Sequence, residues 1–293
     1  MEKIACKICG STNHKPFVKV PDRFDSGMEF EIVKCECGFV FLNPRPALDE
    51  IGKYYEHESY DPHKSQTKTL FDFAYRFVQT IALTWKKKTV ERYISRGRLL
   101  DIGGGAGEFC QHMAKYGWDV TVQDTSPEAL ALAERRGVLG VKSLDALKKS
   151  AKYDLITMWH ALEHIHDIDA LYGSSIDGML KPGGVLVVAV PNHNAPERKY
   201  FGKSWAPYDA PRHLYHFDLE CLTRIQNKYG FEIIGAHSLY QDTPYNILLS
   251  SGARDPKSLI RMAAIWIKSL SENIRLGVSH SSSMMVVARR TQV

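Results

Sequence analysis

The sequence predicts an α/β protein: a mostly parallel β-sheet covered by helices on both faces, preceded by a small cysteine-bearing module. From residue 98 onward, short β-branched runs alternate with helical segments, as a parallel sheet with crossover helices requires. The first of these runs ends in the glycine-rich turn GGGAG at residues 103–107. Four of the six cysteines fall within the first 37 residues.

Composition excludes several classes of partner. A chain of 293 residues with 44% hydrophobic content can bury one large core and support a small additional module. The net charge of +5 is mild, and the one basic run, Lys86-Lys87-Lys88, is interpreted as a solvated helix face, so we expect no nucleic-acid partner. No signal sequence and no apolar stretch of about 20 residues is present. These features predict a cytoplasmic protein without a membrane span.

The N-terminal cysteines form two close pairs, Cys6 with Cys9 and Cys35 with Cys37. Their thiolates could converge on one tetrahedral ion, which predicts a zinc-ribbon-like module at residues 1–46 that holds structural Zn²⁺. The C-x-C spacing of the second pair leaves His14 as an alternative ligand, and unligated thiols as the alternative to a metal. Seven Lys or Arg against six Asp or Glu in this segment argue against phosphate binding.

Residues 47–96 are expected to form a helical connector or lid. Apolar side chains recur there at helical spacing, at Phe71, Ala74, Tyr75, Phe77, Val78 and Ile81. The aromatic stretch at residues 54–60 could line a ligand or lie on an amphipathic surface.

The glycine-rich turn predicts a cofactor site. Residues 98–102 form a strand, and Gly103, Gly105 and Gly107 then allow a ligand to approach the backbone. The dinucleotide fingerprint would place glycine at position 108, where this chain has Glu108. A carboxylate at the start of a helix repels a diphosphate but not a ligand that carries ammonium and sulfonium groups. S-adenosylmethionine is such a ligand.

Later segments continue the pattern in chain order. The second strand, residues 120–124, ends at Asp124, where an acid can bind ribose hydroxyls, and Thr125 to Glu128 then begin a helix. A fourth strand covers residues 153–160. A Pro-Gly-Gly turn leads into a continuous apolar strand at residues 185–190.

Together, the segments LLDIGGGAGEF, VTVQDTSPEAL, YDLITMWHALEHI and LKPGGVLVVAVPN resemble successive motifs of the class I S-adenosylmethionine-dependent methyltransferases. The cysteine pairs, CGFVFLNPRP and HLYHF resemble a bacterial subgroup of small-molecule methyltransferases with a zinc-binding leader. The resemblance implies a Rossmann-like seven-stranded domain at residues 97–293, with a sixth strand at 231–240 and a final antiparallel strand at 283–289. The helical insertion at 241–282 would carry an apolar stripe that serves as a cover or a homodimer contact.

The resemblance also implies site residues. Those for S-adenosylmethionine are Asp101, Gly103, Gly105 and Gly107 around the methionyl part, Asp124 with the adjacent Thr125 at the ribose, Leu144 and Asp145 at the adenine, and Met158 and Trp159 at the sulfonium. The HALEH segment resembles the EVLEH stretch of quinone-type O-methyltransferases, whose side chains can hold a divalent ion. His160, Glu163 and His164 are therefore candidate ligands, with packing and helix capping as the alternative.

The acceptor is expected to lie against the loop at residues 192–217, which includes PYDAPRHLYHF and crosses the carboxyl ends of the strands. We predict His213 as general base and His216 as second choice, with Asp209 orienting an imidazole or the acceptor and Arg212 binding an anionic group. Alternatively, both histidines cap the following helix. The predicted reaction is methyl transfer to a hydroxyl of a small molecule: a sugar or glycan precursor, a phosphorylated metabolite or a phenolic intermediate.

Three other functions are compatible with these motifs. An rRNA base methyltransferase should show a basic RNA-facing surface and salt-dependent binding. A sugar C-methyltransferase usually carries a further C-terminal domain. A non-catalytic S-adenosylmethionine-binding subunit should bind the cofactor without turnover.

Overall fold

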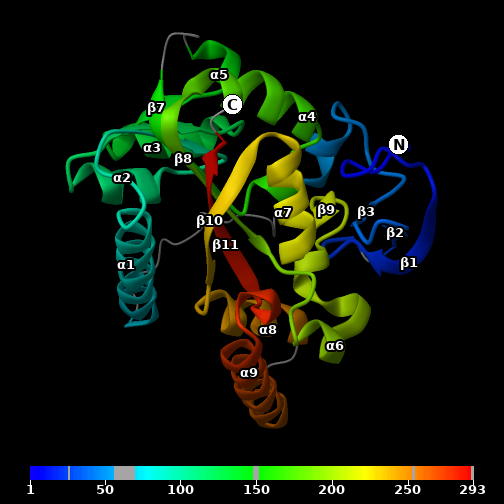
Figure 1. Ribbon diagram of the computed structural model, residues 1–293. Coiled ribbons are helices and arrows are strands. Elements are labelled where there is room, and N and C mark those ends of the chain that lie inside the picture. Colours follow the sequence, from blue (N-terminus) through cyan, green and yellow to red (C-terminus); the bar gives the residue numbers. More distant parts are fainter. Residues whose placement is uncertain (26, 56–69, 148–151, 253–254, 292–293) are drawn as a thin grey trace.

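The computed structural model describes residues 1–25, 27–55, 70–147, 152–252 and 255–291, with backbone only at 70–78 and 256. The described part of the chain contains a seven-stranded sheet and a four-stranded sheet (Figure 1).

The seven-stranded sheet has the order β10-β11-β8-β7-β4-β5-β6. Neighbouring strands from β8 to β6 pair in parallel, whereas β11 is antiparallel to both β10 and β8. The predicted sheet and its final antiparallel strand are confirmed. The strands are β4 (Arg98–Ile102), β5 (Asp119–Gln123), β6 (Leu139–Val141), β7 (Tyr153–Trp159), β8 (Leu180–Pro191), β10 (Phe231–Ser238) and β11 (Ser283–Arg290).

This sheet separates two hydrophobic cores. Along β8, Val185 and Val187 face one core while Leu186 and Val188 face the other, and all four are fully buried. A strand buried on both faces has to be continuously apolar, as residues 185–190 of β8 are. The helices before the insertion are α1 (Leu70–Val90), α2 (Glu108–Ala114), α3 (Pro127–Arg135), α4 (Ile168–Ala170), α5 (Asp177–Met179), α6 (Arg198–Phe201) and α7 (Leu219–Lys228).

The four-stranded sheet combines the N-terminus with the loop after β8. Its order is β1-β2-β3-β9, from β1 (His14–Pro21), β2 (Glu29–Cys35), β3 (Val40–Leu42) and β9 (Tyr215–His216). Phe41 pairs with Tyr215, and the ring of Phe39 stacks on that tyrosine. The sheet therefore extends beyond the expected module at 1–46, because its fourth strand belongs to the acceptor loop.

The connector contains a 3₁₀ turn at Ile51–Tyr54 and helix α1. The expectation for Tyr60, and those for the side chains of the apolar stripe from Phe71 to Val78, lie outside the described residues. Ile81, the last member of that stripe, is exposed.

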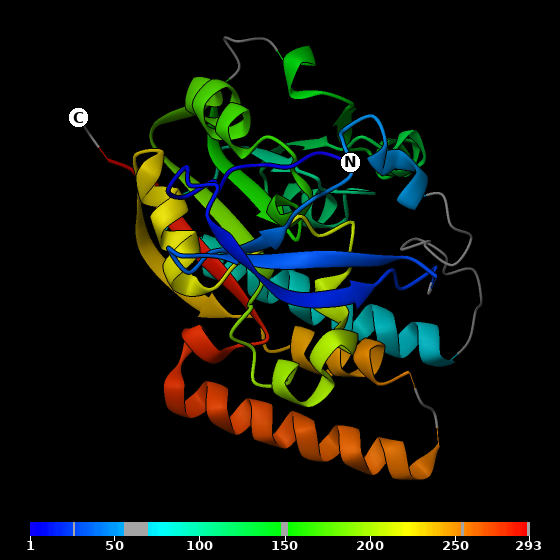
Figure 2. The same cartoon turned by 90° about the vertical axis from the view of Figure 1, so that its right-hand side faces the viewer.

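The insertion before β11 folds as α8 (Asp242–Ser251) and α9 (Pro256–Leu276), with α9 at the periphery of the molecule (Figure 2). Helix α9 buries Ser269 and Asn273 but exposes Ile260, Ile267 and Ile274, which share a face at seven-residue spacing. A homodimer contact through this stripe stays a prediction. Within the described ranges, no helix has the length and apolarity needed to cross a membrane.

Candidate active site

A pocket of about 220 Å³ lies at the carboxyl end of β4. Asp101, Gly103 and Trp159 line it from the sheet, and Glu108 and Phe109 from the start of α2. Helix α1 forms a further wall through Gln79, Ala82, Leu83 and Lys86. The pocket lies where open α/β sheets bind ligands.

The glycine turn has the backbone that the sequence predicted. Gly103, Gly105 and Gly107 have φ of +66°, +55° and +73°. A side chain is excluded at Gly103, since its Cβ would lie 2.6 Å from that of Ala161. The Gly105 amide donates a hydrogen bond to Asp124 Oδ2 at 2.8 Å, so Asp124 fixes the turn.

Asp101 is a buried carboxyl at the pocket wall, 1% exposed. Thr157 Oγ1 donates to its Oδ1 at 2.6 Å. Burial raises the pKa of Asp101 to about 7, although the Thr157 hydrogen bond and the charge of Lys86 act in the opposite direction. Its charge state therefore depends on pH near neutrality.

Lys86 was missed as a site residue because it belongs to a basic run that was interpreted as solvated. Its Nζ lies 4.1 Å from the centroid of the Trp159 ring. Burial lowers the pKa of Lys86, and the carboxylates of Asp242 and Asp101 act to raise it. The spacing of Gln79, Leu83 and Lys86 places them on one helix face, a signal that could have identified this lysine.

The other predicted cofactor residues differ in their surroundings. Trp159 lines the pocket and packs edge-on against Phe109, whereas Met158 is fully buried in the core. Thr125 is exposed next to Asp124. Leu144 and Asp145 lie in a 3₁₀ turn that Ser143 caps.

Beside the expected acceptor loop at residues 192–217, Glu163, His164 and His213 bring one ligand atom each to within 4.8 Å of one another. Glu163 is 1% exposed, and neither carboxylate oxygen has a hydrogen bond among the described residues. His213 Nδ1 lies 2.8 Å from the carbonyl oxygen of Pro207. His164 Nδ1 lies 3.0 Å from the carbonyl oxygen of Arg212. Carbonyls only accept, so the Nδ1 of His213 donates to Pro207, whereas the Nδ1 of His164 also lies 3.0 Å from the Tyr55 hydroxyl. Burial lowers the pKa of His164 to about 4, so it is neutral.

His160 is not part of this cluster, which corrects the expected set of His160, Glu163 and His164. Its Nε2 lies 2.9 Å from Asp242 Oδ2, and its Nδ1 lies 3.6 Å from Glu163 Oε1. Burial lowers the pKa of His160, but these carboxylates outweigh it and raise the pKa to about 10. A charged imidazole cannot ligate a metal, and the third residue near Glu163 and His164 is His213.

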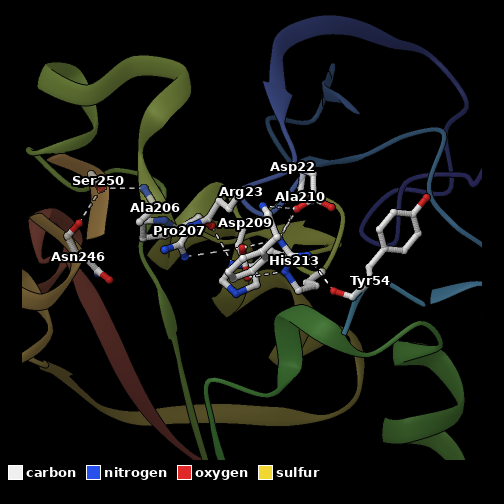
Figure 3. A network of polar contacts seen from close by, with 12 residues as sticks. Asp22, Arg23, Tyr54, Ala206, Pro207, Asp209, Ala210, His213, Asn246 and Ser250 are labelled. Atoms are coloured by element: carbon white, nitrogen blue, oxygen red, sulfur yellow. Dashed lines mark hydrogen bonds and ion pairs between the residues drawn. The ribbon is translucent and has the colours of Figure 1, made fainter. Parts of the chain in front are cut away.

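Arg212 is fully buried. Its partners Asp22, Tyr54 and Asp209 belong to the network of polar contacts drawn in Figure 3. Its Nη2 donates to Asp22 Oδ1 and to Asp209 Oδ1, both at 2.9 Å. The expectation that Arg212 binds an anionic substrate group is therefore not supported, because both carboxylates already neutralise it. Asp209 likewise binds arginine, and the Pro207 carbonyl takes over its expected role of orienting the imidazole.

His216 is buried in β9, where its ring packs against those of Tyr208 and His193. Burial holds its pKa well below the ordinary value. The helix-capping alternative is not supported for either histidine, since Asp218 caps α7 by accepting from the Cys221 amide.

The four N-terminal cysteines converge. Their sulfurs lie within 4.8 Å of one another, with Cys6 to Cys37 and Cys9 to Cys35 both at 3.5 Å. Tetrahedral zinc with bonds of about 2.3 Å needs sulfurs about 3.8 Å apart, which these positions fit. His14 instead contacts Asn43 at 2.8 Å and is not in the group.

Comparison with known proteins identifies a methyltransferase domain in this chain. The family model described as "Methyltransferase domain" matches residues 73–236. Ubiquinone biosynthesis O-methyltransferases of Bradyrhizobium sp. and Chelativorans sp. are 32% and 35% identical over 33% and 32% of this chain. The matched parts span only 41% and 40% of those proteins.

A solved structure shares the fold. Phosphoethanolamine N-methyltransferase 2 of Haemonchus contortus, in complex with S-adenosyl-L-methionine, matches with a TM-score of 0.51 at 19% identity. The match covers 96% of this chain and 69% of that one. The sheet order and this match show the fold of the class I S-adenosylmethionine-dependent methyltransferases. Because the family model matches more than half of the chain, the chain belongs to the methyltransferase-domain family.

Proposed function

We propose that this protein transfers a methyl group from S-adenosylmethionine to a hydroxyl of a small molecule, with His213 as general base. The observation that carries the proposal is the hydrogen bond from His213 Nδ1 to the Pro207 carbonyl, which leaves Nε2 as a proton acceptor. The O-methyltransferase names of the relatives support oxygen as the methylated atom.

The pocket residues would bind the cofactor by charge and backbone contacts. Asp124 faces the glycine turn, where a ribose-binding acid is needed, and Asp101 offers a carboxylate to the ammonium group. Lys86 supplies a cation for the carboxylate of the methionyl part. When bound, S-adenosylmethionine supplies a methyl group on a positively charged sulfur.

In the reaction, His213 would take the acceptor proton at Nε2. The Pro207 carbonyl then continues to accept the Nδ1 proton, and the carboxylate of Asp209 stabilises the imidazolium electrostatically. A base near neutral pH raises the nucleophilicity of the hydroxyl as the methyl group is displaced.

The experiment is methyl transfer from labelled S-adenosylmethionine to protocatechuate, a nucleotide sugar and phosphoethanolamine, with products identified by NMR. Formation of a methyl ether supports the proposal. A product methylated on carbon or nitrogen, or cofactor binding without transfer to any of these, contradicts it. Salt-dependent RNA binding would instead favour the rRNA alternative.

A divalent cation at Glu163, His164 and His213 is the second candidate feature, favoured by three ligand atoms within 4.8 Å of one another and by a buried carboxylate whose ion pair with His160, at 3.6 Å, is longer than a hydrogen bond. The His213 imidazole donates its Nδ1–H to a carbonyl, as metal-binding histidines usually do. A cation there would act as a Lewis acid on the acceptor hydroxyl. Turnover that requires added Mg²⁺ or Mn²⁺, and loses this dependence in Glu163→Gln, would make His213 a ligand and not the base.

Cofactor affinity is expected to fall as pH drops below 7. The ammonium group of bound S-adenosylmethionine would lower the pKa of Asp101 from about 7. Binding to the protonated carboxyl must therefore release a proton. Affinity is then full above pH 7 and falls by up to about tenfold per unit below it. Calorimetry with S-adenosylmethionine from pH 5.5 to 7.5 measures this, and Asp101→Asn should remove the slope. An equal slope in that variant would assign it to another group.

We also propose structural Zn²⁺ at Cys6, Cys9, Cys35 and Cys37, because the sulfurs fit a closed four-ligand site. Cys35→Ser should reduce bound zinc from about one per chain to near zero and lower the Tm, since structural metal contributes to folding free energy. Mass spectrometry under native conditions measures the zinc. Cys110→Ser, also buried but outside the cluster, is the matched control. Full zinc retention in Cys35→Ser would exclude this site.

A further inference from the structure

The connection between β1 and β2 reaches the acceptor loop. Asp22 immediately follows β1 and is 5% exposed. Its Oδ1 accepts hydrogen bonds from the Phe24 amide at 3.0 Å and from Arg212 Nη2 at 2.9 Å (Figure 3). The connection that follows β1 of the four-stranded sheet thus places a buried carboxylate beside Arg212, 190 residues further along the chain.

Arg212 distributes its donors over three segments. Besides Asp22, it donates from Nε and Nη2 to the carboxylate of Asp209 and from Nη1 to the Tyr54 carbonyl at 3.0 Å. The ring of Phe24, beside Asp22, lies 4.6 Å from its guanidinium carbon. A planar guanidinium with fixed donor directions orients all the groups that it binds.

Asp209 transmits this geometry to His213. Asp209 has φ of +26°, a conformation that a non-glycine residue keeps only when its surroundings hold it. Its carbonyl accepts from the His213 amide at 3.0 Å, and the Pro207 carbonyl accepts from the imidazole. The turn from 207 to 213 therefore fixes the position of the ring.

A second connection runs through the backbone. The Leu42 amide of β3 donates to the Leu214 carbonyl at 2.9 Å, and the Leu214 amide donates to the Glu163 carbonyl at 2.8 Å. Leu214, next to His213, therefore links the N-terminal sheet to the segment that carries Glu163 and His164.

We infer that Asp22 is a positioning residue for the acceptor side of the active site: through Arg212 and Asp209 it holds the turn that presents His213. The N-terminal part of the four-stranded sheet then has a second role: besides folding residues 1–46, it helps to form the catalytic site. The inference rests on the proposed function only where it names His213 as the base. Its structural part concerns the order of residues 207–217 and can be tested without any acceptor.

The first test is hydrogen exchange followed by mass spectrometry on Asp22→Asn, with S-adenosylhomocysteine bound. Loss of the charge opposite Arg212 should release the turn and accelerate exchange in the peptide at 207–217 by about tenfold or more. The glycine-turn peptide at 101–108 should exchange as in the unaltered protein. Asp25→Asn is the matched control, because Asp25 lies in the same connection but is exposed. Equal exchange at 207–217 in both variants would overturn the inference.

The second test separates turnover from cofactor binding, with protocatechuate or the best acceptor of the panel. Asp22→Asn should lower kcat by about tenfold with the Kd of S-adenosylhomocysteine unchanged, and Asp22→Glu should restore part of kcat. In a His213→Ala background, Asp22→Asn should have little further effect. Fully additive losses would show that Asp22 does not act through His213. If His213→Ala itself leaves turnover unchanged, the proposed function fails, while the exchange result still decides the role of Asp22.

Discussion

Replacement of His213 by alanine is expected to lower kcat by about 100-fold or more, because the acceptor hydroxyl then loses the base that takes its proton. The Kd of S-adenosylhomocysteine should stay within about twofold, because the pocket at Asp101 and Gly103 does not include this side chain. Discontinuous assays with labelled S-adenosylmethionine measure kcat, and calorimetry measures the Kd of S-adenosylhomocysteine. Added imidazole should recover part of the lost rate, since the missing side chain leaves space for it.

The control for His213 is His237→Ala, on the edge strand β10, where the ring contacts Tyr93. This variant should keep kcat within about twofold, since its contact lies outside the acceptor loop. Unchanged turnover in His213→Ala would leave the histidine a structural role. Recovery by Mn²⁺ and not by imidazole would identify it as a metal ligand.

Replacement of Asp124 by alanine is expected to weaken S-adenosylmethionine binding by about 100-fold. The side chain accepts from the Gly105 amide at 2.8 Å and the Ser126 amide at 2.9 Å, so its loss releases the glycine turn and removes the proposed ribose contact. Hydrogen bonds to a charged group contribute about 1.5–3 kcal/mol each, and 1.4 kcal/mol corresponds to tenfold in Kd. Calorimetry measures the change.

The matched control for Asp124 is Asp119→Ala, at the opposite end of the same strand, where the carboxylate is exposed and pairs with Arg98. Its cofactor affinity should stay within about twofold, because exposed ion pairs contribute little. Unaltered affinity in Asp124→Ala would mean that the cofactor site has been misplaced.

The parts of the site that the sequence predicted well follow from local pattern and sheet topology. Asp101 and Asp124 each come at or just after the carboxyl end of a parallel strand, and β4 and β5 are neighbours. Parallel strands bring these ends to one edge, so the two acids had to meet at the glycine turn. No long-range contact had to be known for that prediction.

The acceptor side could not be predicted as well, because its contacts join distant segments. Arg212 looked available for a substrate, yet it is neutralised by Asp22 and Asp209. Lys86 looked solvated, yet helix α1 places it against Trp159. In both cases the residue type was informative, but its partner depended on how separate elements pack.

The sequence by itself determined a mostly parallel sheet, the turn at Gly103 and the two cysteine pairs, because strand periodicity, positive-φ glycines and ligand spacing are local properties of the chain; the seven-stranded order followed from the resemblance to the class I methyltransferases. Only the tertiary structure decided that β9 joins the N-terminal sheet, that His213 lies beside Glu163 and His164, and that His160 pairs with Asp242 as well as Glu163. Burial and ion pairing set these outcomes: a buried charge must find a partner, and the chain supplies it from whichever element packs beside it.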